Sequence, residues 1–210
     1  MLPDPLLPLA GEYQIFNLFR YITFRSGGAM LTSLILALMF GDAFIRWLKS
    51  HQAEGQPIRS DGPESHILTK AGTPTMGGLL ILACFILATL LWVPLKNPYL
   101  WPVLLVAASY GSIGAVDDWL KLKKRSSDGM SGRQKLLFQV VAAFLASLIL
   151  IQLSPEALRY GVALPFVKDT LLYLGIFYVP FAILVIVGAS NAVNLTDGLD
   201  GLAIVPVMIV

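Results

Sequence analysis

Two neighbouring carboxylates, Asp117 and Asp118, follow an apolar run and stand just ahead of a cluster of basic residues. Adjacent acidic side chains at a membrane boundary repel each other, so a compensating cation is expected. That cation is either a lysine, since Lys121 follows Asp117 by one helical turn, or a metal ion. Proteins usually hold Mg²⁺ with one or two carboxylates together with substrate phosphates, and lysines can neutralise the remaining phosphate charge. The pair therefore favours phosphate chemistry over a plain ion pair.

A second polar segment begins with SDGPESH at residues 60–66 and continues as KAGTPTMGG from Lys70. Either threonine of this segment can cap a following helix, with the proline between them in its first turn. The paired glycines let a ligand approach the backbone closely. A P-loop is excluded because these glycines are not followed by Lys and then Ser or Thr. Any phosphate contact of this segment is expected to come from Lys70.

A third segment, NAVNLTDGLDGLA at residues 191–203, carries an amide or a carboxylate at every third position. In a helix this spacing keeps such side chains near one face, and a plain Asp-Gly turn accounts for only part of the pattern. Amides and carboxylates are suited to hydrogen bonds with a sugar and a base. The four residues are Asn191, Asn194, Asp197 and Asp200.

The composition indicates that membrane spans position these segments. The 210 residues are 56% hydrophobic and only 13% charged, and the mean hydropathy is +0.73, whereas soluble domains carry about a quarter charged residues. Apolar runs close to the roughly 20 residues that cross a bilayer predict five complete spans. We expect the fold to be an all-α, multi-spanning helix bundle. The runs cover residues 26–48, 76–95, 99–116, 136–153 and 170–190, and a sixth begins at 201.

The distribution of basic residues predicts the orientation. Of the 15 Lys and Arg residues, nine lie between the first and second or between the third and fourth predicted spans, and a tenth, Arg46, lies at the adjoining edge of the first span. The positive-inside rule places these loops in the cytoplasm and the N-terminus outside. All three polar segments then reach the cytoplasmic membrane face, where they can form one site. We expect residues 1–210 to be a single transmembrane catalytic domain.

Other classes of protein find little support in the sequence. Nothing in the net charge of +2 indicates nucleic-acid binding. Cys84 is the only cysteine, so neither a disulfide framework nor a cysteine-based zinc site is predicted. The first 12 residues lack a basic region that leads into an apolar core, and so do not resemble a cleavable signal peptide.

These motifs resemble the phospho-N-acetylmuramoyl-pentapeptide-transferase family, within the superfamily that moves N-acetylhexosamine 1-phosphates onto polyprenyl phosphates. The segments that carry the resemblance are DGPESH, KAGTPTMGG, the acidic pair with its basic tail, GRQK at 132–135 and NAVNLTDGLDGLA, and the match spans residues 20–210. The resemblance implies a Mg²⁺-dependent enzyme of the bacterial inner membrane, with its active site on the cytoplasmic face. It further implies transfer of phospho-MurNAc-pentapeptide from UDP to undecaprenyl phosphate, which forms lipid I and releases UMP. A homodimer is also implied.

Carried over by motif, Asp117 is the candidate base for the lipid phosphate, with Asp118 beside it, although a covalent-nucleophile role of Asp117 stays open. Either aspartate can contact the metal, and the family's metal-associated aspartate lies beyond residue 210. We therefore expect residues 1–210 to be cut short and inactive alone. The nucleoside side is expected to be lined by Lys70, Thr75, Asn194, Asp197 and Asp200, and the phosphates to be faced by Lys121 and Lys135.

Two other functions are considered. A sister enzyme that transfers GlcNAc 1-phosphate from UDP-GlcNAc to the same lipid shares the aspartate motifs, but not the segment from Lys70. A membrane transporter is the alternative of another class, because charges inside a membrane mark translocation paths. Here the charges gather at the ends of predicted spans on one face, which does not indicate such a path.

Overall fold

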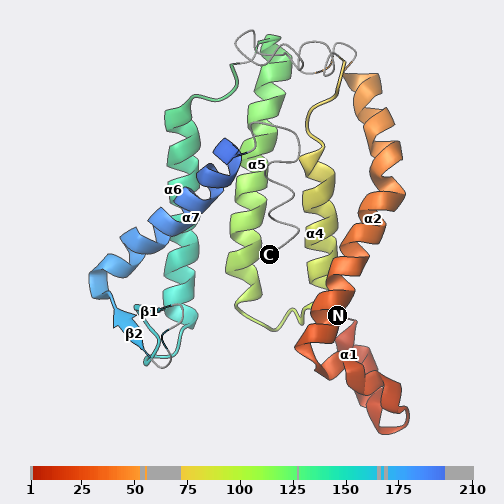
Figure 1. Ribbon diagram of the computed structural model, residues 1–210, viewed down its shortest axis with the longest axis vertical. Helices are drawn as coiled ribbons and strands as arrows, with labels where there is room; N and C mark the ends of the chain where they lie inside the picture. The colour runs from red at the N-terminus through yellow and green to blue at the C-terminus, as the bar shows by residue number, and fades with distance from the viewer. Residues whose placement is uncertain are drawn as a thin grey trace. The chain divides into compact units, whose positions relative to one another are not determined.

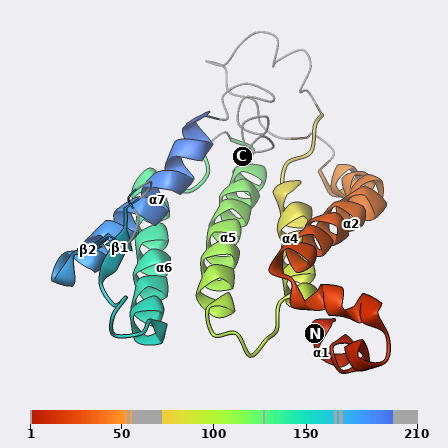
Figure 2. The same cartoon turned by 60° about the horizontal axis from the view of Figure 1, so that its bottom comes forward.

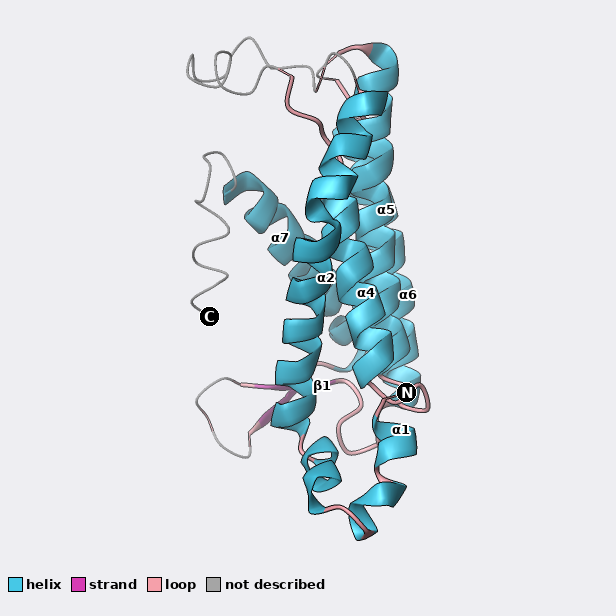
Figure 3. Cartoon of the chain, turned by 90° about the vertical axis from the view of Figure 1, so that its right-hand side faces the viewer, coloured by secondary structure: helices cyan, strands magenta, loops and turns pink. Residues whose placement is uncertain are grey.

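The computed structural model describes residues 2–52, 55, 72–126, 128–164, 167 and 170–196. These residues are helical almost throughout, apart from one short hairpin (Figure 3). The prediction of an all-α, multi-spanning membrane protein is confirmed. Within the described ranges, four helical stretches are long and apolar enough to cross a membrane: α2 (Ile22–His51), α5 (Leu100–Lys124), α6 (Gly132–Leu153) and Gly175–Thr196, in which η3 (Gly175–Phe177) leads into α7 (Tyr178–Thr196).

The second predicted span forms a shorter helix than its hydropathy suggests. α4 (Gly78–Trp92) has 15 residues, which corresponds to about 22 Å against a hydrocarbon core of about 30 Å. Its start is limited by Met76, whose φ of 71° lies in the left-handed region. Its end is set by Pro94, because the residue before a proline avoids the helical region and Val93 is extended. The predicted sixth run lies outside the described residues.

α5 continues about two turns beyond the third predicted span, which was expected to end at residue 116. The helix ends at Lys124, where Arg125 adopts a left-handed conformation with φ of 50° and Ser126 N–H donates to the carbonyl of Lys121 at 3.2 Å. Lysines in the last turn interact favourably with the negative end of the helix dipole. The acidic pair therefore lies inside the helix. The predicted span, which ended at residue 116, had placed the pair just after the helix.

The fifth predicted span begins later than expected. Its first residues form β2 (Leu171–Tyr173), which pairs antiparallel with β1 (Gly161–Ala163), with Val162 opposite Leu172. The positive φ of Gly175, 52°, separates this hairpin from the helix that follows. Because α7 then runs to Thr196, Asn191 and Asn194 belong to its last turns.

By its internal contacts the chain divides into two compact units, Met1–Gly132 and Arg133–Val210. In the first unit α1 (Pro3–Leu6), η1 (Pro8–Gly11) and η2 (Gln14–Arg20) precede α2, which lies along α4 (Figure 1). The two helices approach closely at Gly28, where an added Cβ would lie 2.6 Å from Cζ3 of Trp92. The indole N–H of Trp92 donates to the hydroxyl of Thr32 at 2.9 Å. A small residue and a polar pair thus hold α2 against α4, as is common between membrane helices.

In the second unit the hairpin joins α6 to α7 (Figure 2). Tyr160 contacts the ring of Tyr173 in β2 and that of Tyr178 at the start of α7, with ring centroids 6.3 and 6.2 Å apart. Between the helices, the amide nitrogen of Asn191 donates to Oε1 of Gln139 at 2.8 Å. This contact satisfies the buried amide oxygen of Gln139.

Candidate functional site

The two neighbouring aspartates of α5 have different surroundings. Successive side chains of a helix point about 100° apart, and here the Asp117 side chain is only 6% exposed while that of Asp118 is 29% exposed. A buried carboxylate needs partners for its charge. Lys121 and the backbone of Met130 are two such partners of Asp117.

Lys121 binds both carboxylates. Its ammonium nitrogen lies 2.8 Å from Oδ2 of Asp117 and 3.1 Å from Oδ1 of Asp118. The spacings of four and three residues allow one side chain to reach both acids from the next helical turn. The lysine that the sequence placed beside phosphates is thus the counter-ion of the acidic pair. Lys121 thus holds the two neighbouring carboxylates close together on one side of α5.

A short segment after α5 folds back over Asp117. The backbone N–H of Met130 donates to Oδ1 of Asp117 at 2.7 Å, and Lys124 Nζ donates to the carbonyl of Gly129 at 3.4 Å. A Cβ on Gly129 would collide with Oδ1 of Asp117 and lie 2.8 Å from its Cγ. The close approach of this segment therefore requires glycine at 129. The sequence analysis gave neither Gly129 nor Met130 a role, because a backbone amide leaves no signal in residue types.

The segment that precedes α4 supplies the partner of Asp118. The hydroxyl of Thr75 donates to Oδ2 of Asp118 at 2.7 Å, so two residues 43 positions apart in the sequence meet at one carboxylate. This contact brings Thr75 of the KAGTPTMGG motif against the acidic pair, as convergence of the polar segments requires. Gln52, which the sequence analysis did not select, binds the backbone of Thr75 from the end of α2.

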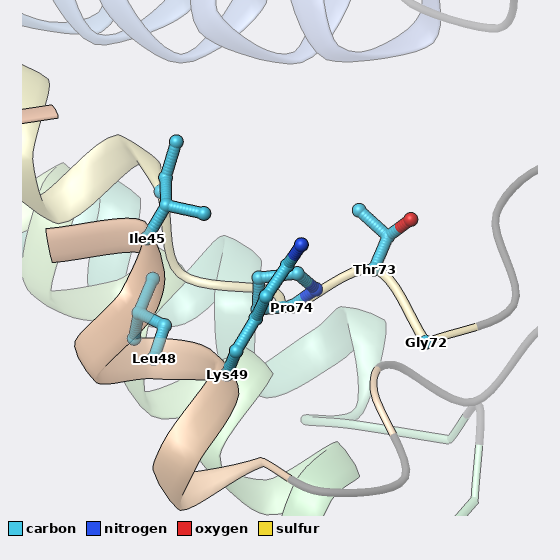
Figure 4. Close-up of a pocket in the computed structure, with 7 residues that line it drawn as sticks. Ile45, Leu48, Lys49, Gly72, Thr73 and Pro74 are labelled. Carbon is cyan, nitrogen blue, oxygen red and sulfur yellow. The ribbon is translucent and has the colours of Figure 1, made fainter. Parts of the chain in front are cut away.

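An open pocket of about 410 Å³ lies between the end of α2 and the same segment. Its walls are largely apolar, with the ammonium of Lys49 and the hydroxyl of Thr73 as polar groups (Figure 4). The pocket thus adjoins the stretch that carries Thr75. The lining residues are Ile45, Leu48, Lys49, Gly72, Thr73, Pro74 and Gly77.

The other residues selected from the sequence lie outside the described part of the first unit. Lys70, Asp197 and Asp200 lie outside the described residues. Lys135, in the first turns of α6, and Asn194, in the last turns of α7, belong to the second unit. Their roles at the site stay predictions.

Carboxylates for a metal ion are few in the described ranges. Among those residues no group of three or more His, Cys, Asp or Glu side chains could hold an ion. Asp117 and Asp118 alone match the one or two carboxylates that commonly hold Mg²⁺ when phosphate oxygens and water complete its shell. Among the described residues, the donor set therefore fits a site shared between protein and a phosphorylated substrate.

The helices and this site describe an integral membrane protein whose acidic pair, lysine and threonine meet at the end of a span. The sequence profile of glycosyl transferase family 4 matches residues 100–210, and a phospho-N-acetylmuramoyl-pentapeptide-transferase signature matches residues 70–82. The chain belongs to glycosyl transferase family 4. The two matched regions contain the three site residues of α5 and Thr75, respectively.

Two relatives match almost the whole chain, and both are named phospho-N-acetylmuramoyl-pentapeptide-transferase. The protein of Granulibacter bethesdensis is 56% identical over 209 residues, which cover 100% of this chain and 58% of that protein. The protein of a Ruegeria species is 54% identical over 204 residues, which cover 97% of this chain and 56% of that protein. The chain thus spans somewhat more than half the length of these relatives.

Proposed function

We propose that the protein transfers phospho-MurNAc-pentapeptide from UDP-MurNAc-pentapeptide to undecaprenyl phosphate, forming lipid I and UMP for peptidoglycan synthesis. The observation that carries the proposal is the contact of Thr75, inside the family signature, with Asp118 of the lysine-bridged acidic pair. The names of the two relatives support the choice of substrates. The spans and the distribution of basic loops support an inner-membrane protein with its site on the cytoplasmic face.

In the proposed reaction, an oxygen of the lipid phosphate forms a bond to the β-phosphorus of the UDP-sugar. The bond from that phosphorus to the bridging oxygen breaks, and UMP leaves. Such transfers depend mainly on positioning and charge neutralisation. Asp117 accepts the proton of the lipid phosphate. The N–H of Met130 and the ammonium of Lys121 hold the two carboxylate oxygens of Asp117 in place.

Lys121 also acts on the substrate in this proposal. An ammonium group has three N–H donors, and the aspartates engage it from two sides. A third donor can bind a phosphate oxygen and so reduce the charge repulsion between the anionic substrates. Lys70 and Lys135, with Asn194, Asp197 and Asp200, are proposed to contact the phosphates and the nucleoside.

Asp117 and Asp118 are proposed to hold Mg²⁺ together with the substrate phosphates. When bound, this ion neutralises the diphosphate charge and polarises its oxygens. The closeness of two carboxylates that share one lysine supports such a site. A reaction at a site of this kind, at the end of a span, needs no channel through the protein. The transporter alternative is therefore disfavoured.

The test uses the complete gene product in detergent with undecaprenyl phosphate. Labelled UDP-MurNAc-pentapeptide and labelled UDP-GlcNAc are offered separately, and both lipid-linked label and UMP are measured. Transfer of the pentapeptide sugar that stops with a chelator and returns with Mg²⁺ is expected. Transfer of GlcNAc 1-phosphate alone would overturn the proposal in favour of the sister activity.

A further inference from the structure

Gln52, the residue that directly follows α2, is hydrogen-bonded within the first unit through both its backbone and its side chain. Its backbone N–H donates to Leu48 O at 2.9 Å, and its carbonyl accepts from Gly55 N–H at 2.9 Å. Its side-chain Oε1 accepts from Thr75 N–H at 2.9 Å, and its Nε2 donates to Thr75 O at 3.3 Å. One side-chain amide thus pairs with both backbone polar groups of a residue 23 positions away.

The paired backbone fixes the direction of the Thr75 side chain. The hydroxyl of this threonine, whose backbone N–H and carbonyl are both bound by Gln52, donates to Asp118 Oδ2 at 2.7 Å. The next residue, Met76, has a φ of 71°. A non-glycine residue in this region is unfavourable and persists only when its surroundings hold it. The Gln52 amide provides such a hold on the residue directly before the turn.

We infer that Gln52 is a positioning residue for the acidic pair, acting through Thr75. The chain of contacts runs from Gln52 to the Thr75 backbone, from the Thr75 hydroxyl to Asp118, and from Asp118 through Lys121 to Asp117. This inference rests on the proposed function, because it takes Asp117 and Asp118 as the groups that act on the substrates. It assigns the end of α2, outside both family-matched regions, to the site.

The test is a double-mutant cycle in the complete gene product, with Gln52→Leu, Thr75→Val and the double variant. Leucine keeps much of the glutamine's bulk and removes both side-chain hydrogen bonds. Gln52→Leu is expected to lower kcat/KM about tenfold, the size of two modest hydrogen bonds. In the Thr75→Val background the same change is expected to cost less than about twofold, because the hydroxyl that Gln52 positions is gone.

Two further measurements separate positioning from folding. Gln14→Leu makes the same substitution at an exposed glutamine in η2 and is expected to leave kcat/KM unchanged. Gln52→Glu keeps the acceptor for Thr75 N–H and loses the donor, so it is expected to restore part of the activity. Independent, multiplicative losses from Gln52→Leu and Thr75→Val would overturn the inference and assign Gln52 a merely structural role.

Amide hydrogen exchange makes the inference testable apart from the proposed function. In Gln52→Leu the exchange of residues 73–77 is expected to accelerate while that of the α4 centre is unchanged, whichever sugar nucleotide the enzyme uses. Unchanged exchange at 73–77 would overturn the inference. If the parent protein transfers only GlcNAc 1-phosphate, the proposed function fails, and the cycle is measured on that substrate.

Discussion

The backbone N–H of Met130 donates to Oδ1 of Asp117 at 2.7 Å, while the other oxygen of this carboxylate faces Lys121 at 2.8 Å. The candidate base is therefore held from two directions by groups on different segments. Each of these contacts can be removed separately. Each variant is made in the complete gene product and is purified unless cells or vesicles are named.

Gly129→Ala is expected to lower transfer activity by more than about tenfold, or about 1.4 kcal/mol of transition-state stabilisation. The new Cβ collides with Oδ1 of Asp117 and must displace the segment that carries the Met130 N–H. The control is Gly132→Ala, where an added Cβ meets nothing within 4 Å. Equal activities of the two variants would show that the segment over Asp117 has no part in catalysis.

Asp117→Asn is expected to reduce turnover at least about 100-fold, the range typical for loss of a general base. Asparagine retains an oxygen that can accept from Met130 N–H, so UDP-substrate binding should change little. Turnover and binding of the labelled UDP-sugar are measured in parallel. Near-normal turnover would remove Asp117 from the catalytic role, and label retained on denatured wild-type protein would indicate a covalent nucleophile instead.

Lys121→Gln is expected to lower both activity and thermal stability, because it removes the ammonium group that pairs with the buried carboxylate of Asp117. Breaking a buried ion pair destabilises more than removing both charges. The double variant Asp117→Asn, Lys121→Gln should therefore recover thermal stability without recovering activity. The measurement is the thermal midpoint in detergent beside the transfer assay. A double variant less stable than Lys121→Gln would contradict this account of the pair.

Gly28→Ala is expected to lower the thermal midpoint, since its Cβ would overlap the ring of Trp92 at the contact between α2 and α4. Overpacking of this kind commonly costs about 1–3 kcal/mol. The neighbouring substitution Gly27→Ala is the control, because nothing lies within 4 Å of its Cβ. If both variants have the same thermal midpoint, the close approach at Gly28 does not contribute to stability.

Cysteines introduced at Lys123 and at Lys96, each with Cys84 replaced, are expected to react with an impermeant thiol reagent from opposite sides of the membrane. Lys96 precedes α5, a helix of 25 residues, and Lys123 lies in its last turn; the basic end is predicted to be cytoplasmic. Labelling is compared in intact cells and in inverted vesicles to show which side of the membrane each cysteine faces. Labelling of both from the same side would show that α5 does not cross.

The sequence was sufficient to predict the apolar helices, and it offered Lys121 as one of two possible partners of Asp117. Hydropathy identifies a span without any tertiary information, and Lys121 could be paired with Asp117 because a helix fixes the spacing. Boundaries were less predictable. α4 is shortened by the local geometry at Met76 and Pro94, and the first residues of the fifth run pair as β2 because β1 is available to them.

Contacts that rest on backbone groups or on distant segments could not be predicted. Nothing in the residue types near 130 indicates that its N–H reaches Asp117, and Gln52 carries no motif. The meeting of Thr75 with Asp118 was expected only as convergence of two polar segments, without the identity of the pair. Such contacts depend on how α2, α4 and α5 pack, which a periodic pattern does not determine.

The environment of Trp92 gives the protein an optical reporter of its own. Of the four tryptophans, Trp47, Trp101 and Trp119 are each about half exposed, whereas Trp92 stacks on Phe19 at 5.8 Å and gives its indole N–H to Thr32. An indole bound within the protein is shielded from solvent relaxation and emits at shorter wavelength than a hydrated one. Replacing the other three tryptophans with phenylalanine would leave a fluorescence signal that follows the separation of α2 from α4.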